Sequence, residues 1–357
     1  MIPQTDQQRM LADAARQFAD REHTPQRLRA CRDRKPDFDR NLWQSIAGLG
    51  WLGVLVPEED GGLGAGLGDM AQLVYAWGRA CAPEPLVAAG VLAARAVVHA
   101  DGPARARLLG GLTEGKTVIA LASDADLRET SGTLDGTLRL VVPAHADGFV
   151  VRAGERLVWV ASEAKGVSIA HERRADGSHA ARVTLASVKT SPDDIVATTP
   201  APAERALDEA RILAAVEMCG MMKAMLDMTL DYLRTRVQFD KPIGSFQALQ
   251  HRAVDLYVAE QLARDVAQQA CSAVDEGALQ GNELALLACR AKARAGESLA
   301  LISREAVQMH GAIGFTDEFA LGLYVNRALV LFAWLGNTTM MRARYARLAP
   351  PMQALAA

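Results

Sequence analysis

Two short polar segments carry the residue types best suited to holding a charged ligand. Residues 236–251 place a cation at Arg236, a Pro-Gly turn and an amide at Gln247 between two long helical patterns. Residues 308–315 begin with an amide at Gln308 and contain Gly311 and Gly314. An arginine at a helix end can bind a phosphate through two N–H groups, and glycine lets the backbone approach a ligand closely. The two segments therefore suit an anionic ligand.

The patterns around these segments divide the chain of 357 residues into three parts. Residues 1–116 read as an N-terminal helical domain, with helices over 8–22 and 38–49 and Asp69 as the cap of a third. Residues 117–200 contain short β-rich runs, which predict a middle β-barrel or sandwich. Residues 201–357 carry four long helical patterns, over 203–236, 248–276, 282–309 and 317–347, and predict a C-terminal four-helix bundle. The expected fold class is mainly α with a small β domain.

Composition limits the classes of partner. The formal net charge of -3 and pI near 6.2 give no basic excess for nucleic acid. The five cysteines include no Cys-x-x-Cys pair, and the polar start and the lack of a long apolar run predict a cytoplasmic protein without a membrane span. His251 and His310 stand alone without ligand spacing, so we expect no metal.

Domain order and motifs together resemble the acyl-CoA dehydrogenase family over nearly the whole chain. The resemblance rests on Leu49-Gly-Trp-Leu-Gly-Val-Leu-Val-Pro-Glu-Glu-Asp-Gly-Gly62, on Tyr232-Leu-Arg-Thr-Arg-Val-Gln-Phe-Asp-Lys-Pro-Ile-Gly-Ser-Phe-Gln247 and on Gln308-Met-His-Gly-Ala-Ile-Gly-Phe315. It implies that six residues meet the adenosine half of an FAD held mainly by a neighbouring subunit: Arg236, Phe239, Gln247, Gln308, Gly311 and Gly314. The protein would then be an oligomer. Asp240 departs from the glycine that the family has there.

The resemblance also implies a reaction. An acyl-CoA thioester loses its α-proton to a carboxylate and its β-hydrogen as hydride to the flavin, giving the trans-2-enoyl-CoA. The electrons would pass to an acceptor such as an electron-transfer flavoprotein. These expectations describe an FAD-dependent oxidoreductase acting on fatty or steroid acyl chains.

The carboxylate that this reaction needs is missing from its usual position. The family's usual Tyr-Glu-Gly-Thr segment corresponds here to Trp334-Leu-Gly-Asn337, which puts Leu335 in place of the base. Other members carry the base in the first helix of the bundle, where this chain has Ala210. Glu209 is its neighbour, and Glu217 lies two helical turns beyond Ala210 among apolar residues, so both remain candidates.

The β domain departs from the family as well. The flavin-holding loop of the family is replaced by residues 120–128, where Ser123 and Asp124 could be remnants, and a second loop is contracted to residues 140–149. We therefore expect one subunit of a heteromeric acyl-CoA dehydrogenase, with a sister chain that supplies the base and the flavin-ring contacts. Two alternatives stay open: a homomeric enzyme that uses Glu217 or Glu209, and a non-catalytic paralogue that binds partners.

Overall fold

The computed structural model describes residues 4–32 and 34–350 and divides into two compact units. Unit 1 comprises the chain up to Arg29, Leu67–Ala82 and everything from Arg211 onward. Unit 2 comprises Ala30–Gly66 and Pro83–Ala210. Both units are therefore built from segments that are distant in sequence.

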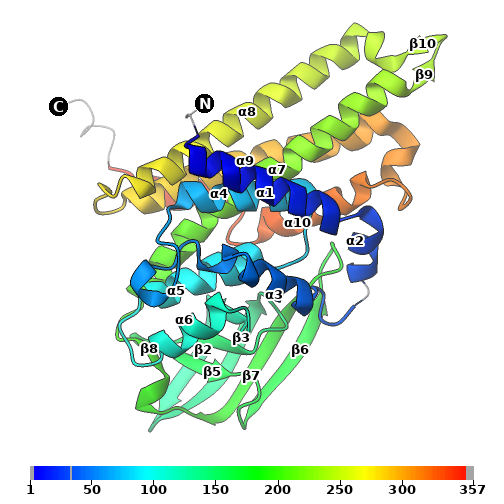
Figure 1. The fold of residues 1–357 in the computed structure, drawn as a ribbon. Helices are drawn as coiled ribbons and strands as arrows, with labels where there is room; N and C mark the ends of the chain where they lie inside the picture. The colour runs from blue at the N-terminus through cyan, green and yellow to red at the C-terminus, as the bar shows by residue number, and fades with distance from the viewer. Residues whose placement is uncertain (1–3, 33, 351–357) are drawn as a thin grey trace. The chain divides into compact units, whose positions relative to one another are not determined.

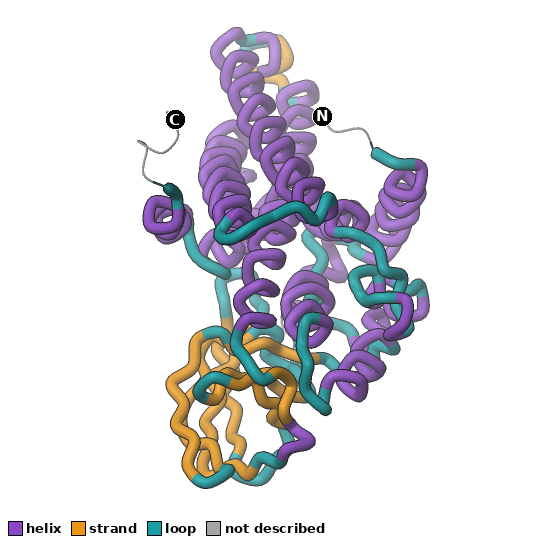
Figure 2. The backbone as a smooth tube through the Cα atoms, turned by 90° about the vertical axis from the view of Figure 1, so that its left-hand side faces the viewer, coloured by secondary structure: helices purple, strands orange, loops and turns teal. Residues whose placement is uncertain are grey.

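Unit 2 contains the β body, which is made of two four-stranded sheets (Figure 2). One sheet has the order β1-β4-β5-β8, with β1 and β4 parallel and the other pairs antiparallel. The other has the order β2-β3-β7-β6 and is antiparallel throughout. The strands are β1 (Ile119–Ala122), β2 (Asp124–Thr130), β3 (Thr133–Val141), β4 (Gly148–Ala153), β5 (Arg156–Ala161), β6 (Val167–Arg173), β7 (His179–Lys189) and β8 (Ile195–Ala197).

The helices of unit 2 support one buried apolar segment. All eight residues of the π-helical turn Leu86–Ala93 are buried, and this segment packs against β1. It continues directly into α5 (Ala94–Val98), so a rigid, fully buried stretch sets the position of α5. The other elements are α3 (Arg40–Gly48), α6 (Arg105–Thr113) and the short 3₁₀ turns Trp51–Gly53, Glu58–Asp60 and Pro192–Asp194.

Unit 1 is helical (Figure 1). Its long helices are α7 (Ala201–Thr235), whose residues up to Ala210 belong to unit 2, α8 (Gln247–Asp275) and α9 (Glu283–His310). Small residues allow close packing: a Cβ on Gly78 of α4 would meet the Glu217 carbonyl of α7 at 2.0 Å. The remaining elements are α1 (Asp6–Glu22), α4 (Leu67–Ala80), α10 (Leu321–Ala333), α11 (Thr338–Leu348), the strands β9 (Val237–Gln238) and β10 (Lys241–Pro242), and the 3₁₀ turns Ile243–Ser245 and Gly311–Phe315. Helix α2 (Pro25–Arg32) crosses from unit 1 to unit 2.

The predicted fold class, mainly α with a small β domain and a helical C-terminal part, is confirmed. The single helix predicted over residues 317–347 is wrong, because the chain leaves helical geometry after Ala333 and re-enters it at Thr338. Leu335 and Gly336 in this break have φ of +60° and +99°, which a continuous right-handed helix cannot contain. Within the described residues, no helix is both long and apolar enough to cross a membrane.

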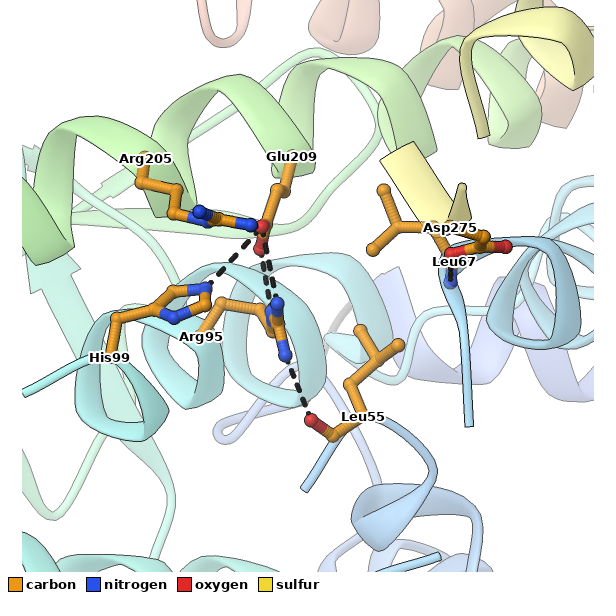
Figure 3. A network of polar contacts seen from close by, with 7 residues as sticks. All are labelled: Leu55, Leu67, Arg95, His99, Arg205, Glu209 and Asp275. Atoms are coloured by element: carbon orange, nitrogen blue, oxygen red, sulfur yellow. Dashed lines mark hydrogen bonds and ion pairs between the residues drawn. The ribbon is translucent and has the colours of Figure 1, made fainter. Parts of the chain in front are cut away.

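Asp69 was expected to cap the helix that became α4, and this prediction is also wrong. Helix α4 begins at Leu67, before Asp69, and the carboxylate of Asp275 at the end of α8 accepts from its first N–H groups. The distances are 2.6 Å to Leu67 N and 2.8 Å to Gly68 N; Figure 3 shows the contact between Asp275 and Leu67. A carboxylate in this place satisfies free donors and interacts favourably with the helix dipole.

Candidate functional site

The segment that carries Arg236 forms a hairpin at the end of α7. Strands β9 and β10 pair antiparallel across a two-residue turn made by Phe239 and Asp240, with φ of +55° and +61°. Positive φ at both central residues is the geometry of a type I′ turn, which favours glycine or asparagine. Asp240, where the family has glycine, tolerates this conformation better than most residues do. The turn is therefore kept, with a strained aromatic residue at its tip.

The hairpin displays a cation and an aromatic ring to the outside. Arg236 is exposed, and no described residue forms an ion pair with its guanidinium. Phe239 is 85% exposed, and its ring meets that of Phe246 edge to face at 6.0 Å. Gln247 is exposed at the first position of α8. A free guanidinium beside an uncovered ring fits a ligand that carries phosphate and an aromatic base.

The second polar segment lies at the end of α9, next to α7. The ring of His310 stacks on Tyr232 with centroids 4.6 Å apart, and Tyr232 is one turn before Arg236. Gln308 is exposed on the last turn of α9. The structure thus holds the ends of α7 and α9 together in unit 1.

The two glycines of this segment have different roles. Gly311 ends α9 at a φ of +63°, and a Cβ added there would meet nothing within 4 Å, so its surface is open to a ligand. Gly314 is buried, and a Cβ there would lie 3.1 Å from the carbonyl oxygen of Val307. The lack of a side chain at Gly314 therefore allows close packing against α9. The lack of a side chain at Gly311 leaves free space at the surface.

The position of the usual base lies in the break between α10 and α11. Leu335 is partly buried, and its carbonyl oxygen accepts from Arg211 Nε at 3.0 Å. Lys292 of α9 is almost fully buried beneath the break. Its Nζ donates to the carbonyls of Leu331 and Gly336 at 3.0 Å and to that of Phe332 at 3.4 Å. The free carbonyls at the end of α10 are thus satisfied by one ammonium group.

The surroundings of Lys292 disfavour its charge. Burial, with a smaller contribution from the positive charge of Arg211, lowers the pKa of Lys292 to about 7, although the charge of Glu217 opposes this. With Leu335 at the base position, this region binds backbone carbonyls through Arg211 and Lys292 and offers no carboxylate to take a proton.

Glu217, one of the two candidate bases, is occupied by a cation. Its Oε1 accepts from Arg327 Nη2 of α10 at 2.7 Å and from Nε at 3.3 Å. The side chains are 7% and 17% exposed, so the pair is largely shielded from water. The apolar neighbours expected around Glu217 are present, since Met218 and Cys219 are buried.

Glu209, the other candidate, lies at the centre of a cluster in unit 2 (Figure 3). Its fully buried carboxylate accepts from Arg95 Nε at 2.6 Å and from Arg205 Nε at 3.0 Å, and His99 Nε2 lies 3.3 Å away. Arg95 also donates to the Leu55 carbonyl at 2.9 Å. Burial alone would raise the pKa of Glu209, but the hydrogen bonds from His99 and Arg95 and the charge of Arg95 outweigh it and lower this pKa to about 2.

The stretch that replaces the flavin-holding loop has no loop in it. Strand β1 ends at Ala122 and β2 begins at Asp124, so only Ser123 stands between the two sheets. The contracted second segment is a short connection from Val141 of β3 to Gly148 of β4.

Lys292 and Arg327 were missed by sequence reasoning. Lys292 had a detectable signal, because it falls on the apolar stripe of its helix, three or four residues from its buried neighbours Ala288 and Ala295. A lysine at such a place is buried and must find acceptors. Arg327 gave no comparable signal, since its partner is 110 positions away.

Comparison with known proteins gives a consistent result. The family model "Acyl-CoA dehydrogenase, N-terminal domain" matches residues 5–116, and "Acyl-CoA dehydrogenase, C-terminal domain" matches residues 201–349. The acyl-CoA dehydrogenase IpdE2 of Mycobacterium tuberculosis is 31% identical over 329 residues, which covers 92% of each chain.

Two solved structures are similar over almost their whole length. The ChsE4-ChsE5 complex from Mycobacterium tuberculosis has a TM-score of 0.90 at 25% identity, covering 98% of this chain and 99% of the other. The Tcur3481-Tcur3483 steroid ACAD, in its G363A variant, has a TM-score of 0.87 at 28% identity with the same coverage.

Proposed function

The chain belongs to the acyl-CoA dehydrogenase family, and on that premise we propose that it is one subunit of a heteromeric, FAD-dependent acyl-CoA dehydrogenase. A sister chain supplies the base and the contacts to the flavin ring. This chain supplies Arg236, Phe239, Gln247, Gln308 and Gly311 to the adenosine half of the partner's FAD. Gly314 keeps Gly311 in place by packing against α9. The division into residues 1–116, 117–200 and 201–357 belongs to the same proposal.

The observation that carries the proposal is that none of the three candidate base positions holds an unpaired carboxylate. Leu335 cannot accept a proton, and Glu209 and Glu217 each face an arginine in a buried pair. A carboxylate with a pKa lowered to about 2 is a very weak base for a thioester α-proton. The chain keeps the groups that reach outward to a ligand, and none of the three candidate positions Leu335, Glu209 and Glu217 offers an unpaired carboxylate.

The residues of this chain bind and hold rather than react. FAD, when bound, accepts the hydride from the acyl chain. Arg236 has five N–H donors in a planar fork, which suits the pyrophosphate better than a lysine would. Lys292 and Arg211 fix the backbone of residues 331–336, which include the position where the family usually has its base, Leu335 in this chain.

An exposed apolar stripe on α8 supports the assembly. Four residues at helical spacing, with exposed fractions between 47% and 58%, form this α8 stripe: Val254, Tyr257, Val258 and Leu262. Their spacing of three and four residues places them on one face. Apolar residues gathered on one exposed helix face indicate a protein interface.

The names of similar structures support a proposal for the substrate class. One similar structure is a complex of two named chains and another is a steroid ACAD. We infer that this chain also pairs with an unlike chain and that the assembly acts on a bulky, steroid-derived acyl-CoA. An electron-transfer flavoprotein would reoxidise it.

The test compares the chain alone with the chain co-expressed with a second family member that has glutamate at the base position. We expect the chain alone to lack a full complement of flavin and to have no turnover. The co-purified complex should be yellow and should bleach with a steroid-derived acyl-CoA. One FAD per protomer and full turnover by the chain alone would show a homomeric enzyme. A colourless complex, even with added FAD, would show a non-catalytic paralogue.

Leu335→Glu is a second arm of this test. This variant restores a carboxylate at the base position, but under the proposal the contacts to the flavin ring still come from the sister chain. We expect no turnover from this variant alone. Turnover from it would mean that the chain holds its own flavin and lacks only the base.

A further inference from the structure

Three metal-ligating side chains from separate segments of unit 2 meet at one point. Asp37 lies between α2 and α3, His145 lies between β3 and β4, and His179 opens β7. One ligand atom from each lies within 4.8 Å of the other two. We propose that these residues form a binding site for a divalent transition metal, with Zn²⁺ as the ion that suits them best.

The ligand atoms are somewhat farther apart than in a closed tetrahedral zinc site. Asp37 Oδ1 is 3.9 Å from His145 Nε2, Asp37 Oδ2 is 3.5 Å from His179 Nδ1, and the three ligand atoms lie within 4.8 Å of one another. With zinc about 2.0 to 2.1 Å from nitrogen or oxygen, two ligand atoms at the tetrahedral angle are roughly 3.3 Å apart. The three side chains would therefore have to draw together by up to roughly 1.5 Å around the ion.

The two histidine nitrogens have no other use. Both His145 Nε2 and His179 Nδ1 are buried without a hydrogen-bond partner among the described residues. The whole His179 residue is only 6% exposed, so water does not replace the missing partner. A buried nitrogen without a partner costs free energy, and a metal ion would satisfy two of them together.

A backbone hydrogen bond orients the carboxylate of Asp37. The N–H of His179 donates to Asp37 Oδ2 at 2.5 Å, so one ligand residue orients another. Such supporting hydrogen bonds are typical of metal sites. Oδ1 keeps its lone pairs for the ion.

The arginine next to this site is already neutralised. Arg40 donates to both carboxylate oxygens of Asp147 at 2.9 Å. His171 packs its ring against that of His145 with centroids 4.2 Å apart. Two histidines and a carboxylate leave a fourth zinc position for water.

Such an ion would join parts of unit 2 that are far apart in sequence. The ion would link the segment around Asp37 to the start of β7 and to the connection between β3 and β4. The sequence-based expectation of no metal rested on single histidines. The ligands of this site could not be recognised together in the sequence, because they are up to 142 positions apart. This site is independent of the proposed flavin contacts, which belong to unit 1.

The test uses tag-free, full-length protein stripped of metal with a chelator. Zn²⁺ binding is measured by calorimetry, and Co²⁺ binding by its visible absorption spectrum. We expect one ion per chain, a tetrahedral Co²⁺ spectrum and a higher Tm with zinc. His179→Ala and Asp37→Asn should each weaken binding by about tenfold or more. Asp37→Asn can still accept from the His179 N–H, so it keeps the local fold.

His251→Ala is the matched control, because it removes an exposed histidine of α8 in the other unit. It should bind zinc as the parent does. The proposal is overturned if the parent binds no stoichiometric ion, if His179→Ala and Asp37→Asn bind it equally well, or if His251→Ala abolishes binding.

Discussion

Arg327 Nη2 donates to Glu217 Oε1 across 2.7 Å inside unit 1, so a carboxylate that could have served as a base instead anchors α10 to α7. Pairs of this kind are costly to break, because the remaining partner keeps its buried charge.

Glu217→Gln separates a structural role from a catalytic one. Glutamine can still accept from Arg327 but cannot neutralise it, so we expect a loss of roughly 1–3 kcal/mol in unfolding free energy. Turnover per bound flavin in the co-purified complex should stay within about tenfold of the parent, since a removed catalytic base costs far more. Denaturant unfolding and single-turnover flavin bleaching measure the two effects. Abolished bleaching with flavin still bound would make Glu217 the base.

Acid should weaken unit 2 through Glu209. Its pKa is about 2 in the fold, against an ordinary value of 4.5, so the stabilisation is complete above pH 4.5 and is lost as the pH falls towards 2. Integrated over that range, the contribution is roughly 3 kcal/mol. We expect Glu209→Gln to unfold more easily at pH 7 and to lose this part of the acid sensitivity, as measured by Tm between pH 7 and 3. An unchanged acid transition in Glu209→Gln would contradict this.

Lys292 should also make stability rise with pH, but over a higher pH range than Glu209 does. Its pKa falls to about 7 in the fold, so the unfolded chain binds this proton more tightly. Stability due to Lys292 is therefore lowest below pH 7 and rises as the pH climbs from 7 towards its ordinary value of 10.5. Lys292→Met should remove this rise in stability with pH. It should also lower the unfolding free energy, because three hydrogen bonds to backbone carbonyls are lost. Chemical denaturation of parent and variant at pH 7 and 9 tests it, and parallel pH trends would refute it.

Arg236→Ala should weaken flavin retention in the co-purified complex. Loss of a charge-assisted contact to phosphate costs roughly 1.5–3 kcal/mol, which corresponds to about a tenfold to hundredfold weaker affinity. Arg234→Ala is the control, because this arginine is two positions earlier and pairs with Asp231 on the surface. Flavin released on dilution reports the difference. Equal retention in the two variants would remove Arg236 from the flavin contacts.

Val258→Lys should disrupt the assembly through the α8 stripe. A lysine in the middle of an apolar interface leaves a charge without a partner, so the complex should dissociate while unit 1 stays folded. Light scattering after size exclusion gives the mass, and circular dichroism checks the fold. Met10→Lys, on an exposed residue of α1, is the matched control. A mass unaffected by Val258→Lys would place the interface elsewhere.

Helical periodicity and short β-rich runs were enough to predict the fold class and a β domain within residues 117–200. Strands β2 and β6 lie at the edges of their sheet, where the sequence pattern is weaker. An edge strand can be polar on most positions, so β2 has no apolar alternation to reveal it. Its backbone pairing with β3, and not its side chains, makes it a strand.

The site was less predictable than the fold, because the decisive contacts are long-range. The sequence around Glu209 does not indicate its partner Arg95, which is 114 positions away. The break at Leu335 depends on the ammonium of Lys292, which reaches Gly336 from 44 positions away. Local sequence patterns carry no information about such partners.

The cap that Asp275 places on α4 has a consequence for biosynthesis. The two ends of that contact are 208 positions apart, so the ribosome makes α4 long before it makes the carboxylate that completes it. At about 5–20 residues per second, this delay is roughly 10–40 s. Throughout that time the buried face of α4 has no α8 to cover it. Packing of α8 on this face must therefore wait until residues 247–275, in the last third of the chain, have been made.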